Sequence, residues 1–485
     1  MQKKESAETL FTGNVITDSE AVRNIFSGSF DLIVREILFG NLKIFVFILD
    51  GMCDEIKITE GIIKPLTERH SDINEDSLNT EIRKRLFKGT NVKSVKTVEE
   101  AAQNIILGNL ITVAEGEKEA LAFSVQGFPR KPPGDPQSEQ NERGSQEGFT
   151  DNFKDNVTML RRRLRTPKLV IKQLTLGKTS NTPTLICYMS DKVSDELLDK
   201  VTKRISKINL DAILGSGYIR PFLDNRHPSF FTDTGITERP DTFSSMLLEG
   251  RIGIIVDGTP FALIVPYLFI DYFHAVDDYL SSPYYAIFMR SLRLVCFLIA
   301  ALLPGTFVAV TLFHPEIMPA DIMYGIAAAT GRTPFPIMIE ALTIHFIYEI
   351  VREAGLRMPR SVGHAVSIVG ALVIGDAAVT AGLIAAPMLI VVALTAISSS
   401  VIVKLHEPVA ILRFGFIIIG GFTGLYGIML GIGIMLVDIC SVSPYGIPFS
   451  APVSPFVLKA QEDVLIRKNW TKLNQESKLI QRMKF

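Results

Sequence analysis

The chain is poor in cysteine and tryptophan, with four Cys and one Trp among its 485 residues. The cysteines lie far apart and follow neither a metal-ligand spacing nor a disulfide pattern: Cys53, Cys187, Cys296 and Cys440. We therefore expect no metal site and no disulfide framework. Each cysteine is expected to act as a small, buried apolar side chain.

Signals of enzyme chemistry are lacking as well. The sequence contains no glycine-rich phosphate loop, no clustered set of His, Cys and Asp, and no strand–turn–helix nucleophile motif. These absences predict a protein that is not an enzyme, with no catalytic residues and no cofactor.

Neither the charge nor the N-terminus points to nucleic acid or to secretion. The formal net charge is −1 and the pI is near 6.7, so no basic surface predicts a nucleic-acid partner. The N-terminal MQKKESAETL has no apolar stretch, which argues against a cleavable signal peptide. We therefore expect the N-terminal domain to stay in the cytoplasm.

What the chain does have is an abrupt change of composition near Leu292. The residues before it are rich in Lys, Glu, Asp and Arg, and those after it are mostly Leu, Ile, Val, Ala and Gly. Leu294–Phe313 has no charge, and a helix needs about 20 apolar residues to cross the bilayer core. The sequence thus predicts a large soluble half followed by a multi-span helical membrane domain.

The soluble half contains a repeated pattern of helix, strand, turn and strand. Leu32–Ile37 and Lys43–Leu49 form the strand pair of the first repeat, and Leu169–Leu174 and Thr184–Met189 form that of the second. Each repeat ends in two β-rich runs joined by a Gly-containing turn, Asp257-Gly258 in the second. This pattern predicts two similar α/β subdomains. It also argues against a membrane span over 252–270, because the turn divides that run.

Between the repeats, Gly127–Gly148 is rich in Pro, Gly and charge and reads as a flexible linker. The basic run Arg161–Arg165 has two interpretations, a solvated helix end or a contact to a partner or to anionic lipid. The expected organisation is subdomain 1, linker, subdomain 2, membrane domain and basic cytoplasmic tail, at residues 1–126, 127–149, 150–290, 291–440 and 441–485.

The membrane half has two clear spans and two ambiguous apolar segments. The clear spans are Leu294–Phe313 and Phe414–Val437, and the segments between them are Ile322–Ile350 and Val362–Val403. Hydropathy therefore predicts four to five apolar segments. Basic residues in the loop after residue 350 and in the tail favour a cytoplasmic place for both, and hence four full crossings.

The last span is rich in glycine at spacings that allow helix backbones to approach closely. We expect it to be a packing helix, with four glycines at its contacts: Gly420, Gly424, Gly427 and Gly431.

Ionisable residues at membrane depth are costly and so need an explanation. Four candidates for a pore or polar pathway stand out: Glu340, His345, Glu349 and Asp376. The structural alternative is an interfacial helix with solvated charges, together with a helix break at Asp376.

Several short motifs occur in an order that closely resembles the A-subunit of spore germinant receptors, the GerA family of endospore-forming bacteria. They include Thr237–Asp241, Val256–Phe261, Pro334–Pro336, Arg352–Pro359 and Val369–Gly375. The resemblance implies a multi-pass protein of the inner spore membrane that acts with a transporter-like B-subunit and a lipoprotein C-subunit. It further implies a homo-oligomer in contact with membrane lipid, forming a ligand-gated cation channel that starts germination.

Two other functions remain open from the residues alone. One is a secondary transporter subunit, which the lack of a clear inverted repeat disfavours. The other is a membrane-anchored signalling scaffold without a pore, which the ionisable residues at membrane depth disfavour.

Overall fold

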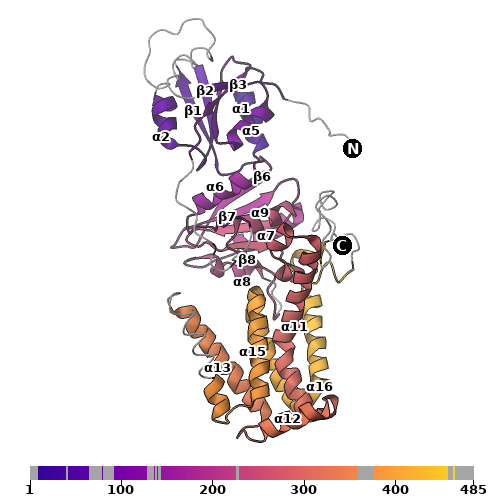
Figure 1. Cartoon of the computed structure of the whole chain (residues 1–485). Coiled ribbons are helices and arrows are strands. Elements are labelled where there is room, and N and C mark those ends of the chain that lie inside the picture. The colour runs from indigo at the N-terminus through magenta and orange to yellow at the C-terminus, as the bar shows by residue number, and fades with distance from the viewer. Residues whose placement is uncertain are drawn as a thin grey trace. The chain divides into compact units, whose positions relative to one another are not determined.

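The computed structural model describes residues 9–39, 42–64, 79, 92–127, 136, 139, 144–224, 229–358, 375–456 and 463–464. They form two compact units, one with residues up to 224 and 234–266, the other with the remainder (Figure 1). Residues 267–290, which the sequence pattern assigned to the second soluble subdomain, belong to the helical unit.

The first subdomain is a five-stranded antiparallel sheet with helices on both faces. In spatial order its strands are β1 (Leu32–Phe39), β2 (Leu42–Leu49), β4 (Asn109–Ala114), β5 (Ala120–Ser124) and β3 (Val92–Val95). Helices α1 (Val15–Ile25) and α5 (Val98–Ile106) bury their apolar faces on one side. Helix α2 (Glu55–Ile58) and the π-helical turn η1 (Thr59–Ile63) contribute Ile58 and Ile62 to a second core.

The second subdomain repeats this plan. Its strands in spatial order are β6 (Leu169–Leu176), β7 (Thr182–Met189), β9 (Ile252–Val256), β10 (Ala262–Val265) and β8 (Gly235–Thr237). Its helices are α6 (Phe153–Arg163), α7 (Asp195–Ser206), α8 (Arg220–Leu223) and α9 (Pro240–Leu248). The two sheets correspond strand by strand, which confirms the repeat inferred from the sequence. Strands β9 and β10 form an antiparallel hairpin, so the rejection of a span over 252–270 is also confirmed.

The helical unit begins with η3 (Phe269–Phe273) and α10 (Asp277–Leu280). It continues with α11 (Pro283–Phe313), α12 (Ala320–Thr330), α13 (Ile337–Arg357), α15 (Ala386–Val401) and α16 (His406–Ser441). Within the described residues, two helical stretches are long and apolar enough to cross a membrane, Pro283–Phe313 and Val403–Ser441. The expected number of crossings therefore stays a prediction.

The long stretch α16 is not one straight helix, because the chain reverses at Gly424. Gly424 has φ +65° and ψ −152°, outside the helical region. A Cβ on Gly431 would lie 2.6 Å from the Phe416 ring, although fifteen residues of straight helix span roughly 22 Å. The two arms, 406–423 and 425–441, therefore lie side by side as a helical hairpin. The single span expected over 414–437 is thus wrong in shape, since the glycine break is invisible to hydropathy.

Contacts within the helical unit define two ends of its bundle. At the aromatic end, the rings of Phe231, Phe269 and Phe449 lie against one another and Phe297 of α11 packs with Phe231 and Phe269. At the turn end, Gly424 lies against Phe313, the last residue of α11. Helix α11 therefore runs toward the turn end, and the second arm of α16 returns to the aromatic end.

Candidate functional site

Glu340 lies on the first turn of α13 and is 1% exposed. Its carboxylate accepts a hydrogen bond from the backbone N–H of Ala385 at 2.6 Å and from the Thr333 hydroxyl at 3.4 Å. Ala385 caps the N-terminus of α15, where the helix dipole favours a negative charge. In this conformation Glu340 joins α13 to α15.

Glu349 lies further along α13, where three helices bring polar side chains together. Its Oε1 accepts from Nη2 of Arg413 on α16 at 2.7 Å, and its Oε2 accepts from Nε of Arg352 at 3.0 Å. His406 places Nε2 3.6 Å from Oε2, and its Nδ1 lies 3.2 Å from the hydroxyl of Ser399 on α15. The carboxylate is thus surrounded by cationic groups.

Two of these buried groups have polar atoms without a partner. His345 is fully buried, and neither of its ring nitrogens makes a hydrogen bond in the described part of the chain. Arg413 is also fully buried, and its Nε and Nη1 have no such bond there, although Tyr348 holds its ring face 5.5 Å from the guanidinium carbon. Unpartnered buried polar groups cost free energy. In the cluster of Glu349, Arg413, His345 and His406, which we call the polar seam, an exchange of hydrogen-bond partners therefore costs little free energy.

The other predicted residues lie elsewhere in the unit. Asp376 is exposed and is not part of the Glu349 cluster. The four glycines are buried, and Gly420 packs on α11, where a Cβ would lie 2.5 Å from the Gly305 carbonyl oxygen. Gly424 forms the hairpin turn, and Gly427 and Gly431 face the opposite arm.

Sequence reasoning missed Arg413 and His406. The uninterrupted apolar run starts at Phe414, so hydropathy places both residues outside the span. One signal in the sequence was available. Arg413 directly precedes an apolar run, and Glu349 is an unexplained carboxylate in another apolar segment, so the two could have been expected to pair.

The soluble unit contains a second polar centre, at the contact between its subdomains. Arg161 is fully buried, and its guanidinium donates to both carboxylate oxygens of Asp31, at 2.7 and 2.8 Å, and to the Ser29 hydroxyl. Phe30 donates its N–H to the carbonyl of Ile171 on edge strand β6. Neither sequence interpretation of the basic run holds for Arg161, since it pairs within the chain.

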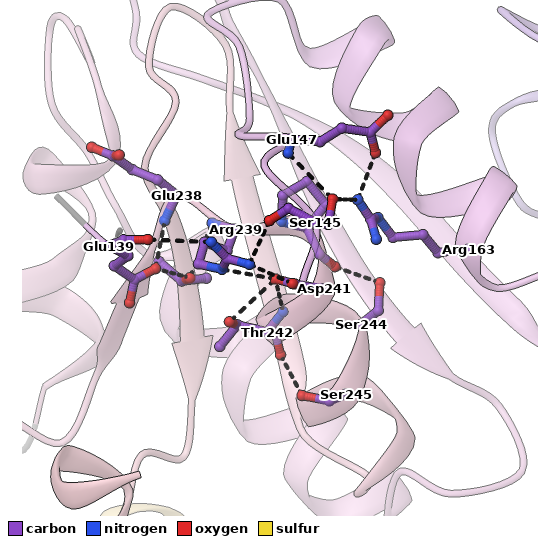
Figure 2. Close-up of polar contacts among 12 residues, drawn as sticks. Glu139, Ser145, Glu147, Arg163, Glu238, Arg239, Asp241, Thr242, Ser244 and Ser245 are labelled. Atoms are coloured by element: carbon purple, nitrogen blue, oxygen red, sulfur yellow. Dashed lines mark hydrogen bonds and ion pairs between the residues drawn. The ribbon is translucent and has the colours of Figure 1, made fainter. Parts of the chain in front are cut away.

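Arg239 organises a polar network beside the linker (Figure 2). Its guanidinium binds the Asp241 carboxylate at 2.6 Å and donates to the carbonyls of Ser145 and Glu139. The Glu139 carboxylate in turn accepts from the Thr237 hydroxyl. The motif Thr237–Asp241 thus holds those linker residues that the structure describes against subdomain 2.

A cavity of about 570 Å³ lies between the subdomains. Its lining includes charged side chains of both signs, from Arg35, Asp50, Asp54, Lys154 and Asp155. Lys154 and Asp50 form an ion pair at 3.0 Å. Cys53 also lines the cavity. Burial raises the pKa of its thiol to about 12, so the side chain is uncharged at neutral pH.

The comparisons with known proteins agree with one another. A family described as Bacillus/Clostridium GerA spore germination protein matches residues 20–479. Spore germination protein KA of Bacillus subtilis (strain 168) is 37% identical over 97% of this chain and 87% of its own length. Spore germination protein GerLA of Bacillus cereus is 30% identical over 94% of this chain and 93% of its own.

One solved structure also matches, the N-terminal domain of the A subunit of the Bacillus megaterium spore germinant receptor GerK3. It covers 54% of this chain and 98% of that chain, with 24% identity and a TM-score of 0.44.

Proposed function

Because the chain belongs to the GerA family of spore germination proteins, we propose that it is the A-type membrane subunit of a nutrient-responsive germinant receptor. Copies of the chain assemble into a cation channel whose opening starts germination. A transporter-like B-subunit and a lipoprotein C-subunit complete the receptor in the inner spore membrane.

The observation that carries the channel proposal is the polar seam inside the helical unit. Buried charges at membrane depth are expensive, and an inert anchor would not need them. Glu340 and Arg413 are buried and Glu349 is half-buried, in the helical unit that also holds both membrane-capable helical stretches. A carboxylate contributed by each subunit of a ring would attract cations.

The course of the helices supports a cytoplasmic N-terminal domain and tail. Helix α11 starts and α16 ends at the aromatic end, so the chain enters and leaves the bundle at the same end. The tail is rich in Lys and Arg, which favours the cytoplasmic side.

The test is reconstitution of the full chain with its partner subunits in liposomes loaded with a K⁺ indicator. We expect a ring-like oligomer, nutrient-dependent K⁺ release, and reduced release in the Glu340→Gln and Asp376→Asn variants. A stable monomer that releases no K⁺ would favour the scaffold alternative, and uptake coupled to a solute would favour the transporter.

A second candidate function rests on the cavity between the soluble subdomains. Its volume and its mixture of both charge signs suit a small polar solute. We expect Lys154→Ala to weaken binding of such a solute to the full chain, measured by saturation-transfer NMR. Equal binding by Lys154→Ala and the unaltered chain would remove the cavity from consideration.

A further inference from the structure

We propose that Glu349 is a binding site for the permeating monovalent cation and that, in this conformation, the guanidinium of Arg413 occupies that site as a tethered blocker. The inference rests on the proposed channel function and names the group that closes the path. Arg413 then acts as a built-in competitor of the ion.

The contacts place Arg413 where a cation would bind. Nη2 lies 2.7 Å from Oε1 of Glu349, and this is the one hydrogen bond that the guanidinium makes among the described residues. The carboxylate is shielded on its other oxygen by Arg352 at 3.0 Å. A cation approaching Oε1 would meet the charge of Arg413, so the ion and the guanidinium exclude each other.

The composition of the site suits a monovalent ion. A divalent ion such as Ca²⁺ takes six to eight oxygen ligands, several of them carboxylates. Within the described residues no group of three or more His, Cys, Asp and Glu side chains could hold a metal ion. Glu349 offers one carboxylate, with the Ser399 hydroxyl reaching the same cluster through His406.

Arg413 is held loosely enough to leave. Among the residues that the structure describes, two of its three guanidinium nitrogens find no hydrogen-bond partner, so the buried side chain loses little beyond one ion pair when it moves. The Tyr348 ring lies 5.5 Å from its guanidinium carbon and can hold a cation by its π face. The guanidinium of Arg413 can therefore remain in contact with the Tyr348 ring after its ion pair with Glu349 has broken.

Helix α13 can separate from α16 at this point because its two ends are held differently. Near Pro336 it is fixed by Ile337, Ala341 and Ile344 in the apolar core and by the bond from Ala385 to Glu340. Beyond Glu349 its larger apolar side chains are more open, with Ile350 at 53% and Leu356 at 70% exposed. The Glu349–Arg413 pair thus joins the loosely packed half of α13 to the hairpin.

The experiment measures K⁺ release from liposomes holding the full receptor, with and without nutrient. Arg413→Gln should leak without nutrient by about tenfold or more over the unaltered chain, because the site is then unblocked. Arg413→Lys keeps the charge and should stay closed. Glu349→Gln should release little K⁺ even with nutrient.

The double variant Glu349→Gln with Arg413→Gln separates a blocker from a packing contact. If Arg413 acts by occupying the ion site, removing the carboxylate as well abolishes the leak. If Arg413 only holds two helices together, the double variant leaks as much as Arg413→Gln does, which would overturn the proposal.

The matched control is the exposed pair of Glu353 and Arg357 on the same helix, where Arg357→Gln should change nothing. If Arg413→Gln does not assemble, Glu349→Gln alone decides, since normal nutrient-dependent release from it contradicts the proposal. If the unaltered receptor releases K⁺ and no variant changes that release, the blocker proposal is refuted and the channel function stands. No release from the unaltered receptor refutes both.

Discussion

At the scale of single residues, Arg290 shows how one buried cation holds a distant piece of chain. Its Nη1 donates to the carbonyls of Asp463 and Val464, each at 2.9 Å, and to the Asp463 carboxylate at 3.0 Å. The hydroxyl of Tyr279 donates to the other Asp463 oxygen, and Nε2 of His274 lies 3.0 Å from the Val464 carbonyl. These contacts tie the start of the tail to the start of α11.

His274 makes this tail contact sensitive to acid. Burial, and then the charge of Arg290, lower the pKa of His274 below its ordinary value of 6.5. His274 binds a proton more readily when the tail segment is detached than when it is attached. The attachment is therefore fully stable above pH 6.5 and weakens as the pH falls below that value. Below that pH, the free energy of attachment falls by up to about 1.4 kcal/mol for each pH unit. We expect hydrogen exchange at Val464 to rise between about pH 7 and about pH 5.

Asp278 and Tyr279 provide the controls for that titration. Burial alone would raise the pKa of Asp278, but the hydrogen bond and charge of Arg293 prevail and lower it. Its contribution is therefore present above its ordinary pKa of 3.8 and is lost only at lower pH. Tyr279→Phe should raise exchange equally at every pH. A flat exchange profile from about pH 7 to about pH 5 would exclude His274 as the sensor.

Residue-level chemistry was only partly predictable. Glu340, His345 and Glu349 stand out in the sequence because they are ionisable residues in or beside an apolar segment. What they contact depends on which helices lie together, and the sequence pattern does not determine that. Glu340 accepts from the N-cap residue of a helix, 45 residues further along the chain, and Glu349 meets an arginine 64 residues away.

At the scale of elements, the crossing of α11 with α16 depends on two facing glycines. A Cβ on Gly305 would lie 2.5 Å from the Phe416 carbonyl oxygen, and one on Gly420 as close to the Gly305 carbonyl oxygen. Close approach of backbones is how helices pack in lipid. The contact is thus made within one chain, whatever further packing an oligomer adds.

Gly420→Leu should therefore prevent stable insertion. A branched side chain at this crossing must separate two backbones, and overpacking costs about 1–3 kcal/mol. Gly433→Leu is the matched control, because a Cβ there meets no atom of the described residues within 4 Å. We expect membrane protein levels, followed by immunoblot, to fall for Gly420→Leu and to stay normal for Gly433→Leu. Equal levels for both variants would show that the crossing tolerates separation.

The strand elements were easier to predict than the helical ones, for a physical reason. Alternating apolar residues and Gly-containing turns, Glu115-Gly116 in the first sheet and Asp257-Gly258 in the second, specify hairpins locally, so these hairpins follow from short segments. The hairpin in α16 has no local signal of this kind, because Gly424 is one of several glycines in an apolar run. Only its φ of +65° distinguishes it from Gly420, and φ is a property of the fold.

At the scale of the whole molecule, the duplicated soluble unit depends on one buried ion pair between its halves. The side chains of Arg161 and Asp31 are 0% and 1% exposed. The Ser29 hydroxyl also accepts from the N–H of Ile171 on β6 at 3.1 Å. A segment just before the first sheet is thereby joined to the edge of the second, and the cavity lies beside this junction.

Removing one partner of this pair should separate the two subdomains. Asp31→Asn leaves the Arg161 charge buried without its counter-ion, and such losses cost about 3–5 kcal/mol. We expect an earlier thermal transition in the full chain and faster proteolysis between the subdomains. Glu196→Gln breaks an exposed pair with Lys200 instead, and surface pairs contribute about 0–1 kcal/mol, so it should unfold as the unaltered chain does.

Replacing both partners distinguishes the charge from the packing. If the cost of Asp31→Asn is the stranded guanidinium, then Asp31→Leu combined with Arg161→Met should recover much of the stability, because apolar pairs of similar volume replace buried ion pairs well. The same double variant should still separate more readily than the unaltered chain, since Ser29 loses its bond from Arg161. A double variant as unstable as the sum of both single variants would instead show that shape alone holds the subdomains together.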